Sequence, residues 1–239
     1  MQSIFVMEKL AVKNIDSFSQ CLFYKQSSLF LSEKNMQLLE KHTHALKFKH
    51  GETIFKQGDT ASHIALLNKG IVKFNFEENP SRNLILSIVS APKILGGANM
   101  FYRKKNLFSI TAIGECDIFM VDMQVLGNLL MQNAKYTLML FEKAMEMFET
   151  SILNYISLAN KNVNGRLADI LLYLSEHVYK SETFHLQLTR KEIAEFAGCS
   201  KENVIHILTR WNDEKIIISN VKTITVLDKQ KLMVISRHG

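Results

Sequence analysis

The stretch Leu188-Thr-Arg-Lys-Glu-Ile-Ala-Glu-Phe-Ala-Gly-Cys-Ser-Lys-Glu-Asn-Val-Ile-His-Ile-Leu208 decides the predicted fold of the last third of the chain. Thr189 can cap a helix whose third residue is Glu192, and this Thr-x-x-Glu spacing is a capping box. Gly198 is placed for a left-handed helix end, and Ser200 for the cap of the next helix. Two short helices joined by Gly-Cys-Ser are typical of a helix-turn-helix.

The second of these helices has one apolar face and one open face. The residues predicted to lie inward are Val204, Ile207, Leu208 and Trp211, and those predicted on the open face are Lys201, Glu202, Ile205, His206 and Thr209. Two β-rich runs, 216–219 and 223–227, are joined by Asn-Val-Lys and predict a wing. Because the first residues of such a helix reach base edges in the major groove, we expect double-stranded DNA as the partner. A winged helix that serves protein contacts is the alternative.

The first half of the chain reads as short strands separated by glycines. The runs rich in Ile, Val, Phe and Thr are Ile54-Phe55, Ile64 to Leu67, Ile71 to Phe76, Leu84 to Val89, Phe108 to Ile113 and Ile118 to Val121. Such runs predict an antiparallel sandwich or roll over residues 21–135. Ser32 with Leu38 and Leu39 predicts a short helix before them, and residues 1–20 are expected to be a frayed N-terminal arm. The predicted fold class is therefore α+β.

A long helix is predicted over residues 136–163, where neither glycine nor proline occurs. Its apolar residues alternate steps of three and four: Leu138, Phe141, Met145, Phe148, Ile152, Tyr155 and Ala159. This is the spacing of a two-stranded coiled-coil seam, and it predicts a dimerisation helix. Packing of the same face on the chain's own roll is the alternative. Asn164-Gly165 is expected to break or bend the helix, and residues 164–239 to form the winged helix-turn-helix domain.

Composition restricts the compartment and the partners. The net charge of +6 favours acidic partners such as nucleic acid. Three widely spaced cysteines, Cys21, Cys116 and Cys199, give neither a disulfide framework nor a zinc pattern, so no metal site is predicted. No long uncharged apolar stretch and no secretory h-region occurs, and a cytoplasmic protein without a membrane span is expected.

The helix-turn-helix segment resembles that of the Crp–Fnr family, the cyclic-AMP receptor protein and its relatives. The resemblance continues through Lys49-His-Gly-Glu-Thr-Ile-Phe-Lys-Gln-Gly-Asp59, Leu67-Asn-Lys-Gly-Ile-Val-Lys73 and the long helix, and covers nearly the whole chain. It implies a cyclic-nucleotide-binding-like jelly roll as the effector domain, a dimerisation helix and a winged helix-turn-helix. The implied function is a dimeric, sequence-specific transcription regulator that reads a roughly palindromic operator and contacts RNA polymerase.

The resemblance also implies roles for individual residues. Arg190 and Lys191 match positions that contact phosphates, and Lys201, Glu202 and His206 match positions that face bases. The full predicted DNA-binding set is Thr189, Arg190, Lys191, Ser200, Lys201, Glu202, Asn203, Ile205, His206, Arg210 and Lys222. The family usually has arginine at the position of His206, and imidazole cannot make a bidentate contact to guanine. This departure predicts a changed half-site.

The effector is not identified by the sequence. Family members that bind cyclic nucleotides carry a glutamate for the ribose and an Arg-Ser/Thr pair for the phosphate, but this chain has Gly97, Leu107 and Phe108 there. Because a buried phosphate needs a cationic partner, this argues against cyclic AMP. An iron–sulfur cluster needs about four thiolates, which the chain lacks. Haem stays open as a ligand, with His42, His44, His50 and His63 as candidate axial ligands.

Other functional classes fit less well. A haem- or small-molecule-dependent sensor of the same fold, or a cyclic-nucleotide-type module that acts through protein contacts, are the alternatives kept. A catalytic roll of the cupin type would need metal ligands on adjacent strands, and the one His-x-His pair, His42-Thr-His44, is predicted to end a helix. No nucleophile–base arrangement is recognisable, so we expect a protein that is not an enzyme.

Overall fold

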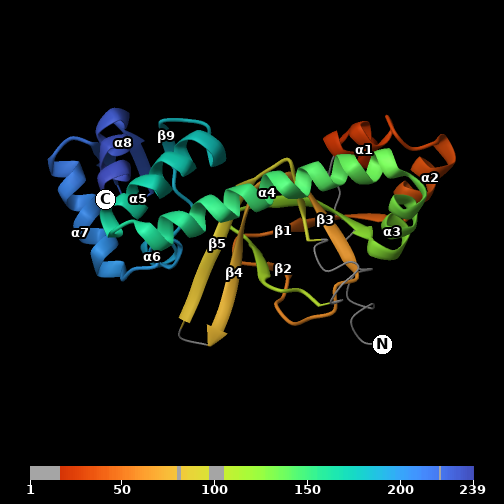
Figure 1. The fold of residues 1–239 in the computed structure, drawn as a ribbon, viewed down its shortest axis with the longest axis horizontal. Coiled ribbons are helices and arrows are strands. Elements are labelled where there is room, and N and C mark those ends of the chain that lie inside the picture. Colours follow the sequence, from red (N-terminus) through yellow and green to blue (C-terminus); the bar gives the residue numbers. More distant parts are fainter. Residues whose placement is uncertain (1–16, 80–81, 97–104, 221) are drawn as a thin grey trace. The chain divides into compact units, whose positions relative to one another are not determined.

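The computed structural model describes residues 17–79, 82–96, 105–220 and 222–239 (Figure 1). It divides into two compact units: unit 1 comprises residues 1–72 and 91–147, and unit 2 comprises residues 73–90 and 148–239. The part of the predicted N-terminal arm that precedes Ser17 lies outside the described residues, as does Gly97.

Unit 1 combines antiparallel strands with short helices. Its helices are a 3-10 turn at Phe18–Gln20, α1 (Leu22–Ser27), α2 (Glu33–Lys41) and α3 (Met123–Gln132). One sheet has the order β1 (Thr43–Phe48), β8 (Cys116–Asp122), β3 (His63–Lys69), β6 (Lys93–Leu95). In it Ala65 of β3 faces Met120 of β8, which in turn faces His44 of β1. Strands β2 (Thr53–Phe55) and β7 (Ser109–Ala112) pair with each other. The predicted antiparallel β-roll class is confirmed.

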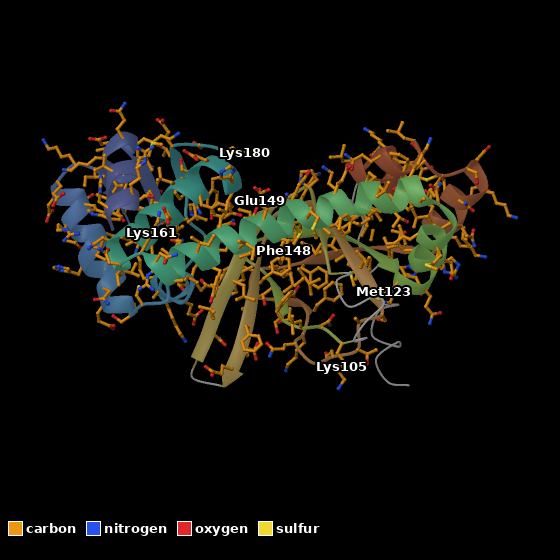
Figure 2. The ribbon with its side chains drawn as sticks, viewed as in Figure 1. Lys105, Met123, Phe148, Glu149, Lys161 and Lys180 are labelled. Atoms are coloured by element: carbon orange, nitrogen blue, oxygen red, sulfur yellow. The ribbon has the colours of Figure 1, made fainter. Side chains whose placement is uncertain are left out.

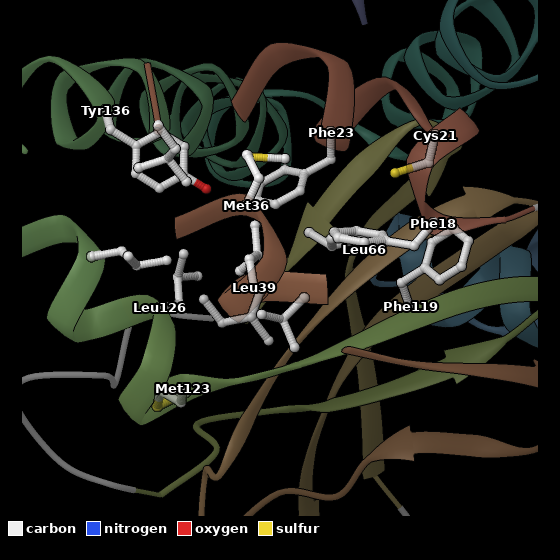
Figure 3. Close-up of a cluster of buried hydrophobic side chains, with 14 residues drawn as sticks. Phe18, Cys21, Phe23, Met36, Leu39, Leu66, Phe119, Met123, Leu126 and Tyr136 are labelled. Atoms are coloured by element: carbon white, nitrogen blue, oxygen red, sulfur yellow. The ribbon is translucent and has the colours of Figure 1, made fainter. Parts of the chain in front are cut away.

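The core of unit 1 lies between these helices and the β3–β8 part of the sheet (Figure 3). Leu39 of α2 is fully buried, and Phe119 of β8 is 1% exposed. Tyr136 is also fully buried, and its hydroxyl lies 3.0 Å from the hydroxyl of Ser27. Burial raises the pKa of Tyr136 to about 12, an effect that the hydrogen bond with Ser27 partly offsets. The short helices therefore close one face of the sheet with a continuous apolar layer.

Unit 2 contains a β-hairpin and a cluster of helices around a small sheet. The hairpin is formed by β4 (Ile71–Asn79), whose first two residues belong to unit 1, and β5 (Arg82–Ser90). Helix α5 (Val163–Tyr173) continues into a π-helical turn at Leu174–Val178. Helices α6 (Arg190–Ala197), α7 (Lys201–Asp213) and α8 (Lys229–His238) follow. The sheet has the order β10 (Ile217–Ser219), β11 (Thr223–Val226), β9 (Thr183–His185). The predicted winged helix-turn-helix is confirmed.

The long helix, α4, runs from Ala134 to Asn160 and is the green helix at the centre of Figure 1. Its end differs from the prediction, which placed the break at Asn164-Gly165. The break lies at Lys161 and Asn162, because the Asn162 side chain accepts hydrogen bonds from the backbone N–H groups of Asn164 and Gly165 and so caps α5. Gly165 instead lies inside α5, where a Cβ would come within 2.9 Å of the backbone of Gly239. The glycine serves close helix packing and not a helix break.

A polar cluster joins the end of α4 to α5 and α8. The ammonium of Lys161, which directly follows α4 in Figure 2, lies 2.8 Å from the carboxylate of Asp169. The hydroxyls of Ser157 and Ser236 also donate to this carboxylate. Three helices thus share one carboxylate, and its donors compensate for its partial removal from water.

The β4–β5 hairpin packs against the helices of unit 2. The Lys73 ammonium donates to the Glu192 carboxylate of α6 at 2.7 Å, and only 16% and 15% of the two side chains are exposed. The Tyr173 hydroxyl donates to the backbone carbonyl of Ile88 at 2.6 Å. Residues 73–90 fall within the predicted roll at 21–135, and they also contact the C-terminal helices of unit 2. Lys73 and Glu192 are 119 positions apart in the chain, so the sequence pattern gives no sign of their ion pair.

We expect Lys73→Met to lower the free energy of unfolding of unit 2 by about 1–3 kcal/mol, because it leaves the largely buried Glu192 carboxylate with one donor fewer. Denaturation followed by the fluorescence of Trp211, the single and buried tryptophan, measures this. Burial disfavours the charged form of Glu192. Hydrogen bonds from Lys73 and Thr189 outweigh this effect of burial and lower the pKa of Glu192. The contribution of Lys73 is therefore present above the ordinary glutamate range and is lost as the pH falls through the lowered pKa.

Lys191→Met is the matched control, because Lys191 lies next to Glu192 on α6 but its side chain is 75% exposed. Its effect on unfolding should be much smaller. Equal losses in both variants, or a Lys73→Met loss that persists undiminished in acid, would contradict the proposed role of the ion pair.

Candidate nucleic-acid interface

The N-terminus of α6 is fixed by the predicted capping box. The hydroxyl of Thr189 accepts from the backbone N–H of Glu192 at 3.1 Å, and the Glu192 carboxylate accepts from the backbone N–H of Thr189 at 2.7 Å. Both residues thus satisfy backbone donors that an uncapped helix would leave without partners. The carboxylate at this end also interacts favourably with the helix dipole. The capping box found in the sequence is confirmed.

The turn between α6 and α7 has the predicted left-handed residue. Gly198 has φ of +58°, and its N–H and that of Cys199 reach back to the carbonyl of Ala194. Ser200 then caps α7, with its hydroxyl 3.2 Å from the backbone nitrogen of Asn203. A Cβ at Gly198 would lie 3.2 Å from a methyl group of Leu158. Backbone conformation and space therefore both favour glycine here.

Helix α7 separates an apolar side from an open side. The inward residues are buried as predicted: Val204, Ile207, Leu208 and Trp211. The open face comprises Lys201, Glu202, Ile205, His206 and Thr209, and all five are exposed. These side chains offer an ammonium donor, a carboxylate acceptor, an imidazole and a hydroxyl along one helix face. The face can thus form hydrogen bonds with donors and acceptors of either kind.

Arg190 lies at the N-terminus of α6 and is half-buried against the wing. One guanidinium nitrogen, Nη2, donates to the Ser219 hydroxyl at 3.0 Å and to the Asn220 carbonyl at 3.1 Å. The other, Nη1, is buried and has no hydrogen-bond partner in the structure. Burial lowers the pKa of Arg190, which stays a cation at neutral pH. The neighbouring Lys191 is well exposed, as is Lys222 in the wing. Exposed lysines beside a guanidinium are suited to an anion such as a phosphate, whereas Nη1 of Arg190 is itself enclosed by protein.

Arg210 differs from the rest of the predicted set in its position. It lies in the last turn of α7, where its guanidinium donates to the Asn164 side chain at 2.7 Å and lies 3.9 Å from the Glu214 carboxylate. The structure therefore does not bring Arg210 together with the residues at the start of the helix. The exposed Ser200 and Asn203 do lie at that start.

Two positioning contacts were not found from the sequence. The side-chain carbonyl of Asn212 accepts from the backbone N–H of Ser219 at 3.0 Å, which ties the end of α7 to the wing. The contact of Arg190 with Ser219 ties the start of α6 to the same strand. A capping box can be read from a four-residue pattern, but these contacts depend on how the helices meet the wing.

Unit 1, where the effector domain is predicted, contains a pocket. Its volume is about 200 Å³, and its lining comes from α1, β3, β6, β8 and α4. Phe23, Leu66 and Phe119 contribute apolar surface, while Lys93 and Lys143 contribute charge. No histidine lines this pocket among the described residues.

Two of the candidate haem ligands, His44 and His63, are close enough to interact electrostatically. His63 lies 2.8 Å from the Ser62 hydroxyl, and the His50 ring contacts the carbonyl of Ile113. His44 lies in β1, so the prediction that His42-Thr-His44 ends a helix was wrong beyond His42. Strand β1 begins at Thr43, directly after the turn residue His42 that ends α2. Over the described ranges, no group of three or more His, Cys, Asp or Glu side chains could hold a metal ion.

Among the described residues, every helix is too short or too polar to span a membrane.

Comparisons with known proteins agree with this geometry. Residues 165–235 match the family model of a Crp-like helix-turn-helix domain, and residues 45–133 match that of a cyclic nucleotide-binding domain. The chain is 26% identical over 189 residues to the cAMP-activated global transcriptional regulator CRP of Pasteurella multocida, covering 77% of this chain and 90% of that protein.

Two solved structures show the same fold. FixK2 from Bradyrhizobium japonicum matches with a TM-score of 0.74 and 16% identity, covering 81% of this chain and 96% of its own. The c-di-GMP responsive global regulator CLP from Xanthomonas campestris matches with a TM-score of 0.67 and 19% identity, covering 82% and 99%.

We expect Gly198→Ala to destabilise the winged helix-turn-helix by about 1–2 kcal/mol, because alanine is strained in the left-handed region. The loss is measured by denaturation followed through Trp211. Gly198→Asn is the control, since asparagine tolerates this conformation better than alanine. If the alanine variant is as stable as the wild type, the turn does not require its left-handed residue.

Proposed function

Because this chain belongs to the Crp–Fnr family of DNA-binding transcription regulators, we propose that it acts as a dimer on a roughly palindromic operator. Each copy inserts α7 into one major groove, and the two half-sites lie about 34 Å apart. The protein has no catalytic role, and RNA polymerase is its expected partner at the promoter.

The open face of α7 is the observation that carries this proposal. Its exposed side chains project from a helix whose opposite side is anchored by the buried Trp211, so they are held on a rigid support. Glu202 can accept from a cytosine amino group, and Lys201 can donate to guanine or to a phosphate. His206 offers fewer donors than the arginine usual in the family, which favours a different base at its position. Arg190, Lys191 and Lys222 are assigned to phosphates, which supply affinity without sequence preference.

The exposed side of α4 supports the dimer. All seven residues of the predicted seam are exposed: Leu138, Phe141, Met145, Phe148, Ile152, Tyr155 and Ala159. Such a row of large apolar side chains on a 27-residue helix exceeds what a monomer normally leaves in water. Figure 2 shows Phe148 near the middle of the helix, where the seam would be most fully covered. A second copy of α4 offers the matching face.

Similar proteins are named for different effectors. The CRP of Pasteurella multocida is named as cAMP-activated, and CLP of Xanthomonas campestris as c-di-GMP responsive. We propose that this chain does not use cyclic AMP in the family's manner. Leu107 and Phe108 stand where the phosphate-binding pair is expected, and Leu107 is 45% exposed. Neither side chain can neutralise a phosphate.

We expect Lys201→Ala and Glu202→Ala to reduce discrimination between the operator that the wild type prefers and a scrambled duplex by about 1–3 kcal/mol each. Equilibrium binding at several salt concentrations measures this. Lys191→Ala is the control: it should weaken binding to both duplexes alike and lower the salt slope by about one. If both open-face variants keep the wild-type preference, the assigned open face does not read the bases.

Phe148→Lys is expected to convert the dimer to a monomer, because it places a charge in the apolar seam. Sedimentation velocity measures the change. Leu153→Lys is a matched control, since Leu153 is 60% exposed against 58% for Phe148 but lies off the seam. An unchanged dimer in the Phe148 variant, or an equal loss in the control, would refute α4 pairing along this seam.

A further inference from the structure

Ile205 is the apolar member of the open face of α7. Its side chain is 46% exposed, while the other large apolar side chains of the helix are at most 5% exposed. Residues four apart share one face of a helix, so Ile205 lies between Lys201 and Thr209. An isoleucine therefore stands at the centre of a surface otherwise made of polar side chains.

The fold gains little from isoleucine at this position. A β-branched side chain is a weaker helix former than alanine or a straight-chain residue. Exposure also leaves much of its apolar surface in water, and so forgoes most of the stabilisation that burial gives. The same helix buries Val204 and Ile207 completely or almost completely, so apolar residues elsewhere in α7 do serve the core.

The major groove contains one apolar group on the base edges, the C5-methyl group of thymine. The other edge groups are hydrogen-bond donors and acceptors, which match Lys201, Glu202 and His206 but not an isoleucine. Thr209, one turn further along, is also exposed and carries a methyl group beside its hydroxyl. Contact with a thymine methyl would remove the exposed part of Ile205 from water, and it would leave no hydrogen-bond donor or acceptor of the base unpaired.

We propose that Ile205 reads the methyl group of one thymine in each operator half-site. This inference rests on the proposed DNA-binding function and adds the identity of a base to it. Ile205 lies three residues after Glu202, about 4.5 Å along the helix axis. Since base pairs rise by about 3.4 Å, the thymine lies within one or two base pairs of the pair that Glu202 contacts.

The test uses the operator selected by the full-length protein and replaces its thymines by deoxyuridine, one symmetric pair at a time. Deoxyuridine keeps the base pair and removes only the methyl group. Because one buried methyl contributes about 0.8 kcal/mol, binding should weaken about three- to five-fold per half-site at one position. The Kd is measured by fluorescence anisotropy at fixed salt.

Ile205 variants then show whether the contact is direct. Ile205→Ala should weaken binding to the thymine operator and abolish the deoxyuridine penalty at that position, whereas Ile205→Val should retain most of it. Val234→Ala is the control, because Val234 is an apolar residue of α8 that is 54% exposed. It should keep the full penalty. Trp211 fluorescence confirms that each variant is folded.

Each outcome separates this inference from the function on which it rests. Sequence-selective binding that is indifferent to the methyl group at every thymine overturns the role of Ile205 alone. A penalty that persists in Ile205→Ala also overturns it, since the methyl would then act through DNA shape. Failure of the wild type to prefer its operator over a scrambled duplex overturns the DNA-binding function as well.

Discussion

The carboxylate of Glu192 lies where the start of α6, its capping residue and the β4–β5 hairpin meet. It accepts from the backbone of Thr189 and from the ammonium of Lys73, and these donors keep it ionised although burial opposes its charge. Lys73 directly follows Val72, the last residue of the first segment of unit 1. One side chain therefore begins the helix-turn-helix and holds the hairpin against it. Through this carboxylate the start of α6 is joined to the hairpin, and the Gly198 turn then leads from α6 into α7.

In the described residues, the surfaces proposed to bind other molecules are separate from the buried cores. Trp211 and Ile207 anchor α7 from one side, while the open face on the other side carries no part of the packing. The same division holds for α4, where Tyr136 is buried and the seam residues are exposed. Substitutions on these exposed surfaces should therefore alter DNA preference or pairing more than folding, which is what allows the two functions to be tested by point variants.

The sequence predicted those features of the structure that depend on neighbours in the chain. The capping box at Thr189, the left-handed Gly198 and the cap at Ser200 each follow from a pattern of a few residues, and all are present. The helix break was misplaced because asparagine at 162 and glycine at 165 both resemble helix ends, and only the approach of Gly239 distinguishes them. Helices α1, α3 and α8 were not predicted, since short helices show few periods of the apolar pattern. The exposure of the open face is confirmed, whereas its contacts with bases remain predictions.

Selection of bound sequences from a random duplex library, with purified protein, no added ligand and fixed salt, tests the central claim most directly. The account predicts enrichment of an inverted repeat whose half-site centres are separated by about one helical turn. That result would establish a dimer that reads two half-sites through paired α7 helices. Binding that depends on salt but enriches no sequence, or enrichment of a single unrepeated site, would contradict the account.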